Sequence, residues 1–71
     1  MKRIAIGTNN LITITLDTAT DRNYYVVRIW DLFHPENDQI TTFDSMAFSY
    51  RHFFLACREN GIEPVKANIM I

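Results

Sequence analysis

The chain has 71 residues, a net charge of −1 and a hydrophobic fraction of 48%. This length allows one domain with a small core, and the composition is typical of a folded chain rather than a disordered one. The net charge excludes both a strongly basic surface for nucleic acid and the strongly acidic surface of a nucleic-acid mimic. No apolar run approaches the roughly 20 residues that span a bilayer, and we recognise no signal peptide. The single cysteine, Cys57, excludes an internal disulfide and fits a reducing compartment, so we expect a cytoplasmic protein.

The N-terminal segment predicts a β-hairpin. Apolar residues alternate with other residues over 2–7 and 11–17, and the intervening Gly-Thr-Asn-Asn tolerates the positive φ of a tight turn. Residues 17–23 are polar and predict a second, longer turn. Residues 24–33 are rich in aromatic and β-branched side chains and predict the longest strand.

Residues 34–40 are predicted to form a polar loop, and residues 43–60 a helix. We expect Thr41 or Thr42 to cap the helix N-terminus and Gly61 to end the helix in the left-handed conformation. Phe48 and Leu55 fall on one side, where the helix of a small domain should be polar. The opposite side collects the predicted core face, which consists of Phe43, Met46, Ala47, Tyr50, Phe53, Phe54 and Cys57.

Residues 65–71 predict a final strand, so the expected element order is β-β-β-α-β in a single domain over 1–71. The predicted class is α+β, with an antiparallel-dominated sheet of four strands and one helix packed on one face. In the long strand, Tyr25, Val27 and Ile29 are the expected helix-facing residues. The alternate residues are then left uncovered, namely Tyr24, Val26, Arg28, Trp30 and Leu32. If the strand faces the other way, the uncovered apolar surface consists of Tyr25, Val27 and Ile29 instead. In either case one face of the strand is left uncovered.

The residues that carry chemistry are few and badly spaced for a catalytic or metal site. His34, His52 and Cys57 do not stand at ligand spacing, so we expect no metal and no cofactor. On a helix His52 and Cys57 project about 140° apart and cannot form a nucleophile–base pair. Ser49 and His52 are neighbours but lack an orienting group and oxyanion donors. We therefore expect no enzymatic activity.

Protein–protein contact fits the surplus apolar surface best, either with a foreign partner or within a homodimer, and no membrane partner is expected. The alternative is a single-stranded nucleic-acid binder that uses Tyr24, Arg28 and Trp30 to stack bases and contact phosphate. The predicted partner-binding residues are Tyr24, Val26, Arg28 and Trp30 on the long strand and Phe48, Arg51, His52 and Leu55 on the helix.

Over about the C-terminal half, Thr42-Phe43-Asp44-Ser45-Met46-Ala47 opens the helix, and Gly61, Glu63-Pro64 and Val65 lead into the last strand. With the predicted strand order, this layout resembles small phage-encoded inhibitor proteins, including anti-CRISPR proteins and phage inhibitors of host RNA polymerase. The chain departs from the strongly acidic members of that group, which argues against DNA mimicry. The resemblance implies inhibition by occluding a surface of a host protein, for example a defence complex, and it assigns no functional residue.

Overall fold

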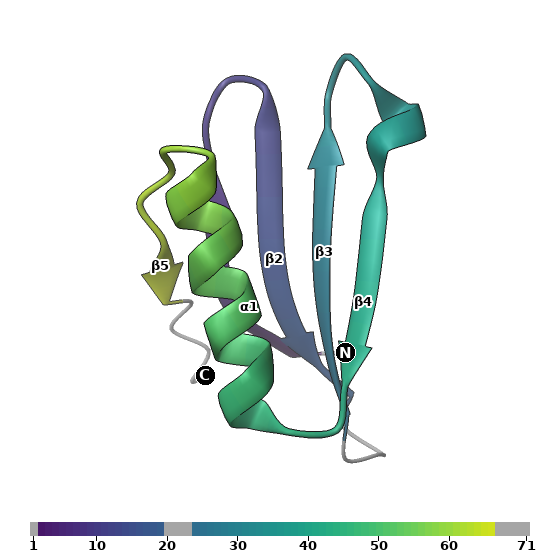
Figure 1. Cartoon of the computed structure of the whole chain (residues 1–71), viewed down its shortest axis with the longest axis vertical. Helices are drawn as coiled ribbons and strands as arrows, with labels where there is room; N and C mark the ends of the chain where they lie inside the picture. The colour runs from purple at the N-terminus through teal and green to yellow at the C-terminus, as the bar shows by residue number, and fades with distance from the viewer. Residues whose placement is uncertain (1, 20–23, 67–71) are drawn as a thin grey trace.

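The computed structural model describes residues 2–19 and 24–66, and they form one antiparallel sheet with one helix on one face (Figure 1). The sheet has five strands in the order β4-β3-β2-β1-β5, and each neighbouring pair is antiparallel. This arrangement confirms the predicted small α+β class. The elements are β1 (Lys2–Thr8), β2 (Ile12–Thr18), β3 (Tyr25–Asp31), a 3-10 turn η1 (Pro35–Asn37), β4 (Gln39–Phe43), α1 (Met46–Glu59) and β5 (Val65–Lys66).

Strand β4 is an addition to the predicted order β-β-β-α-β, which places a loop at 34–40. It pairs with β3 from Tyr25↔Phe43 to Ile29↔Gln39 without a register shift. The segment Gln-Ile-Thr-Thr-Phe is β-branched and aromatic, which suits a strand. The chain therefore returns along β3 before the helix begins, and β4 becomes one edge of the sheet.

The helix begins later than predicted, because its cap is Ser45 rather than Thr41 or Thr42, which both lie in β4. The Ser45 side chain accepts a hydrogen bond from the N–H of Phe48 at 3.4 Å. The other end is confirmed: Gly61 follows α1 with a φ of 66°, the left-handed conformation that glycine adopts at least cost.

The buried face of α1 is rotated from the predicted core face. Its buried residues are Ser49, Phe53, Ala56 and Cys57, whereas Met46, Ala47 and Phe54 are exposed, and Tyr50 is half-buried. Three small side chains around one phenylalanine let the helix backbone come close to the sheet. A face selected by apolar character alone misses Ser49, and the predicted face also omits Ala56.

The core lies between α1 and the middle of the sheet. Ile14 and Leu16 of β2, Val27 of β3 and Phe53 of α1 are fully buried there. Val27 lies opposite Leu16, and Tyr25 and Ile29 pack against the same cluster, so the predicted helix-facing side of this strand is confirmed. The strand predicted at 65–71 is described only through Lys66, and most of the turn predicted at 17–23 also lies outside the described residues. Within the described part of the chain, α1 is neither long nor apolar enough to cross a membrane.

Gly7 of β1 lies close to the end of α1 and to the segment that follows it. A Cβ atom at this position would lie 2.7 Å from Cγ2 of Ile62 and 2.9 Å from Sγ of Cys57. Both distances are shorter than carbon and sulfur atoms tolerate, so only glycine fits without displacing the helix end.

We predict that Gly7→Ala lowers the free energy of unfolding by about 1–3 kcal/mol, the usual cost of overpacking a core. Urea unfolding followed by circular dichroism measures this loss. Gly61→Asn is a control for space alone, because no atom lies within 4 Å of a Cβ at Gly61. It carries only the backbone cost of the positive φ, which is smaller for asparagine than for most residues. Equal stability of Gly7→Ala and the wild type would contradict the packing described above.

Candidate protein-binding surface

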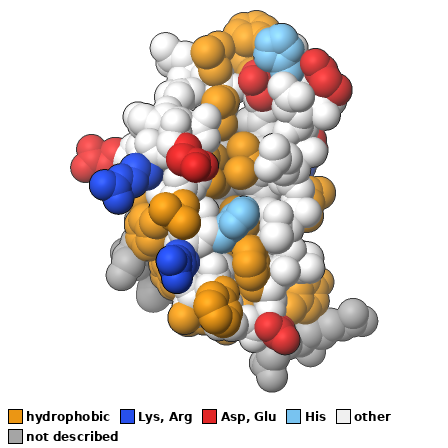
Figure 2. All heavy atoms as spheres, in the orientation of Figure 1, with side chains coloured by type: hydrophobic (Ala, Val, Ile, Leu, Met, Phe, Trp, Pro, Cys, Tyr) orange, Lys and Arg blue, Asp and Glu red, His pale blue; other side chains and the backbone are white. Residues whose placement is uncertain are grey.

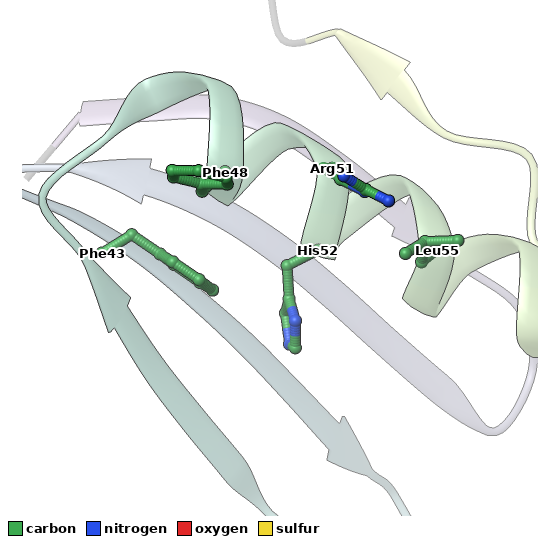
Figure 3. Close-up of a pocket in the computed structure, with 5 residues that line it drawn as sticks. All are labelled: Phe43, Phe48, Arg51, His52 and Leu55. Atoms are coloured by element: carbon green, nitrogen blue, oxygen red, sulfur yellow. The ribbon is translucent and has the colours of Figure 1, made fainter.

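A groove runs between α1 and the edge strand β4. Its first part has a volume of about 350 Å³ and is lined by Phe43, Phe48, Arg51, His52 and Leu55. The four helical residues share one side of α1, because positions three, four and seven apart fall together on a helix. Figure 3 shows His52 pointing from α1 toward the sheet and Phe43 projecting from the end of β4 below the helix.

The wall and the rim of this groove differ in exposure. The rings of Phe43 and His52 pack with their centroids 5.2 Å apart and their planes tilted by 50°, which holds both in place. At the rim Phe48 is 63% exposed and Leu55 is 47% exposed. Arg51 is also exposed, and none of the ion pairs among the described residues involves it. The site therefore offers exposed apolar surface beside a cation.

The groove continues along α1 toward the other end of β4. There Gln39 and Ile29 of the sheet lie across from Ala56 and Glu59 of the helix. Asp31 lines the far end together with Glu59. One end is therefore cationic and the other acidic. Figure 2 shows exposed hydrophobic side chains over α1 and in the strip beside it on this face of the molecule.

The second group of predicted residues lies on the opposite side of the sheet and is engaged within the chain. The guanidinium of Arg28 lies 4.4 Å from the centroid of the Trp30 ring. The same guanidinium donates to Asp38, with Nη2 2.8 Å from Oδ2 and Nε 3.1 Å from Oδ1. These bonds raise the pKa of Arg28 and hold the pKa of Asp38 below its ordinary value. Arg28 is thus already paired with a carboxylate and stacked on an aromatic ring.

The remaining two strand residues differ in accessibility. Val26 is only 9% exposed and offers little contact area. Tyr24 is half-buried and lines a wide hollow of about 660 Å³ with Thr42, Phe43 and Asp44. The predicted set of eight therefore divides in two: Phe48, Arg51, His52 and Leu55 form one continuous surface, whereas Tyr24, Val26, Arg28 and Trp30 do not join it.

Sequence reasoning missed Phe43 as a groove residue and β4 as the free edge beside it. Phe43 was expected on the core face of the helix, because the helix was expected to begin there. The signal that identifies β4 is the β-branched run Ile-Thr-Thr before Phe43, following the Pro35 turn.

The described residues contain no cluster of three or more His, Cys, Asp or Glu side chains that could hold a metal ion. Ser49 is buried, and its Oγ donates to the carbonyl of Met46 at 2.8 Å, so it is not presented to a substrate. Cys57 is fully buried, and burial raises the pKa of its thiol. Neither side chain is available as a nucleophile.

Comparison with known proteins identifies no relative: no family model, no curated protein and no solved structure matches this chain.

Burial of Cys57 predicts a thiol that reacts only after the protein opens. Alkylation by iodoacetamide at pH 8 should be at least about tenfold slower in native protein than in urea-unfolded protein, because the thiolate is disfavoured and inaccessible. Mass spectrometry of timed samples measures both rates. A native rate equal to the unfolded rate would show that Cys57 is exposed.

The Arg28–Asp38 pair predicts an acid-dependent loss of stability. Because the pKa of Asp38 is lowered in the folded state, its contribution is present above the ordinary pKa of an aspartate and is lost as the pH falls through the lowered value. Asp38→Asn should therefore melt at a lower temperature than the wild type at pH 7, and the difference should shrink as the pH falls below the ordinary aspartate pKa of about 3.9. It should be small, because both side chains are exposed. Glu63→Gln is the control, because it removes an exposed carboxylate that belongs to none of the ion pairs among the described residues. A difference that persists unchanged at low pH would contradict this role.

Proposed function

We propose that this protein is a non-enzymatic protein-binding module that acts in the cytoplasm by occluding a surface of another protein. The small phage-type inhibitors that it resembles supply the expected target class, a host protein such as a defence complex. The binding surface is the groove of Phe43, Phe48, Arg51, His52 and Leu55. In this proposal the protein also associates with itself.

The observation that carries the proposal is exposed apolar surface held on a rigid scaffold beside a cation. Phe48 and Leu55 protrude from one side of α1, while the rings of Phe43 and His52 pack against one another below them. Aromatic residues and arginine are enriched among the residues that dominate binding energy in protein interfaces. Rigid placement reduces the entropy lost when a partner binds.

The same geometry gives less support to the nucleic-acid alternative. Bases would have to stack on Trp30, and phosphate would have to pair with Arg28. The Arg28 guanidinium already covers the Trp30 ring and makes two hydrogen bonds to Asp38. A nucleic acid would have to displace both interactions, so we retain the protein-binding proposal alone.

The test is partner capture by three forms of the immobilised protein from a lysate of bacterial cells. Leu55→Glu places a charge in the groove, and Leu11→Glu places one in the β1–β2 turn, at a residue that does not line the groove. The two leucines are 47% and 49% exposed, so both changes should leave the fold intact. We expect the wild type and Leu11→Glu to capture the same protein in equal amounts. Leu55→Glu should capture at least about tenfold less of it, because an interface anchor is worth more than 1 kcal/mol.

Circular dichroism spectra of all three forms check the fold. The proposal is overturned if the three forms retain the same proteins in the same amounts, or if Leu11→Glu loses the captured protein as completely as Leu55→Glu does.

A further inference from the structure

We propose that β4 is a self-association edge: it pairs antiparallel with β4 of a second copy about a two-fold axis at Thr41. The product is one continuous sheet, twice the width of the five-stranded sheet of a single chain, with both helices on the same face. The inference deepens the proposed function, on which it rests, by naming a second copy as one partner of this region of the molecule.

The first observation is that β4 is an unprotected edge. It is the last strand in the sheet order, and the described part of the chain places no element beyond it. Natural edge strands usually carry a charge, a proline or a bulge that prevents pairing with another chain. Residues 39–43 contain none of these, and the pairing with β3 is regular throughout. Ile40, next to the central residue Thr41, is 62% exposed.

The second observation identifies the backbone groups that point outward. The N–H of Leu32 donates to the carbonyl of Leu11 at 2.8 Å, which continues the β2–β3 ladder by one pair. Because hydrogen-bonded pairs alternate, the even-numbered residues of β3 bond to β2 and the odd-numbered residues bond to β4. Their partners on β4 are residues 39, 41 and 43. The N–H and carbonyl groups of Ile40 and Thr42 therefore face the free edge.

These outward groups are self-complementary. With Thr41 opposite Thr41 of the second copy, Ile40 lies opposite Thr42 of the second copy, and the reverse pair forms by symmetry. Both pairs are of the doubly hydrogen-bonded kind. On the outer face, the apolar side chain of Ile40 then lies next to the second copy's Thr42, which lines the hollow beside Tyr24. The full length of β4 is paired in this register.

Charge favours the same arrangement on the helix face. The cationic end of the groove, at Arg51, lies near Phe43, and the acidic end, at Glu59, lies near Gln39. Antiparallel pairing sets Phe43 across from Gln39 of the second copy. The cationic end of each groove therefore faces the acidic end of the other, which is favourable at long range.

One contact in this register is unfavourable, and its removal tests the register. In this register Asp38, just before β4, lies opposite Asp44 of the second copy. Asp38 is already paired with Arg28, whereas Asp44 is exposed and belongs to none of the ion pairs among the described residues. Like charges directly across a strand pair are destabilising. Removing the charge of Asp44 should therefore strengthen the dimer.

The experiment measures solution mass by sedimentation equilibrium over protein concentrations up to about 1 mM for the wild type, Thr42→Pro and Asp44→Asn. Wild-type protein should approach twice 8.3 kDa with a roughly micromolar to millimolar dissociation constant, because the edge is short. Thr42→Pro should weaken the dimer by about tenfold or more, because it removes an outward N–H at two symmetric positions. This N–H is not used by the β3–β4 ladder, so the fold persists, as circular dichroism will check.

Asp44→Asn should tighten the dimer by about two- to fivefold, and raising the salt concentration should reduce this gain. Glu63→Gln is the control, because it removes an exposed carboxylate far from β4 and should leave the dissociation constant unchanged. The inference is overturned if the wild type stays monomeric at every concentration, or if Thr42→Pro and Asp44→Asn leave the dimer unchanged. A monomer whose partner capture still depends on Leu55 would overturn the dimer and leave the proposed function standing. A dimer that captures no partner would overturn the proposed function and leave the dimer standing.

Discussion

The constraint on which the rest of the structure depends is a mismatch of widths. A helix with its side chains is about 10–12 Å wide, whereas five strands at about 4.8 Å spacing span about 19 Å. One helix therefore cannot cover this sheet. In this chain α1 packs mainly on β2 and β3, and β4 extends beyond it (Figure 1). The groove, the exposed Phe48 and Leu55 and the free edge all follow because the helix is narrower than the sheet.

The position of the helix over the sheet is set by small residues. Gly7 on β1 leaves room for Ile62 and Cys57, and Ala56 lets the helix backbone come near the strands. Close packing on this side holds the helix over β2 and β3. Larger side chains at these positions would lift the helix and expose the core, so the surface left open near β4 is a consequence of how the core is built.

Parts of the fold that depend on local pattern could be predicted from the sequence. The hairpin strands, the buried side of β3 and the exposure of Phe48 and Leu55 follow from periodicity, and the end of the helix at Gly61 follows from turn chemistry. The predicted hairpin turn is wrong in detail, because Gly7 lies within β1 and Gly61 alone among the described residues has a positive φ. β4 could not be predicted in this way, because a threonine pair serves equally as a helix cap and as a strand. Pairing with β3 decides between the two, and that interaction is tertiary. The Arg28–Asp38 pair could not be predicted either, because it forms only when the chain turns back along β3.

In a dimer joined at β4, the two helices would still be too narrow to cover the doubled sheet. Each helix lies about two strand spacings from the two-fold axis, so the two helices would stand about 19 Å apart. Directly packed helices are only 8–10 Å apart. The two grooves would therefore stay open toward one another and merge into one trough, with Thr41 at the centre of its floor and Phe48 and Leu55 along both walls. Self-association through the strand edge and binding of a foreign protein through the helix side chains are then compatible, because the first uses backbone groups in the plane of the sheet and the second uses side chains above it.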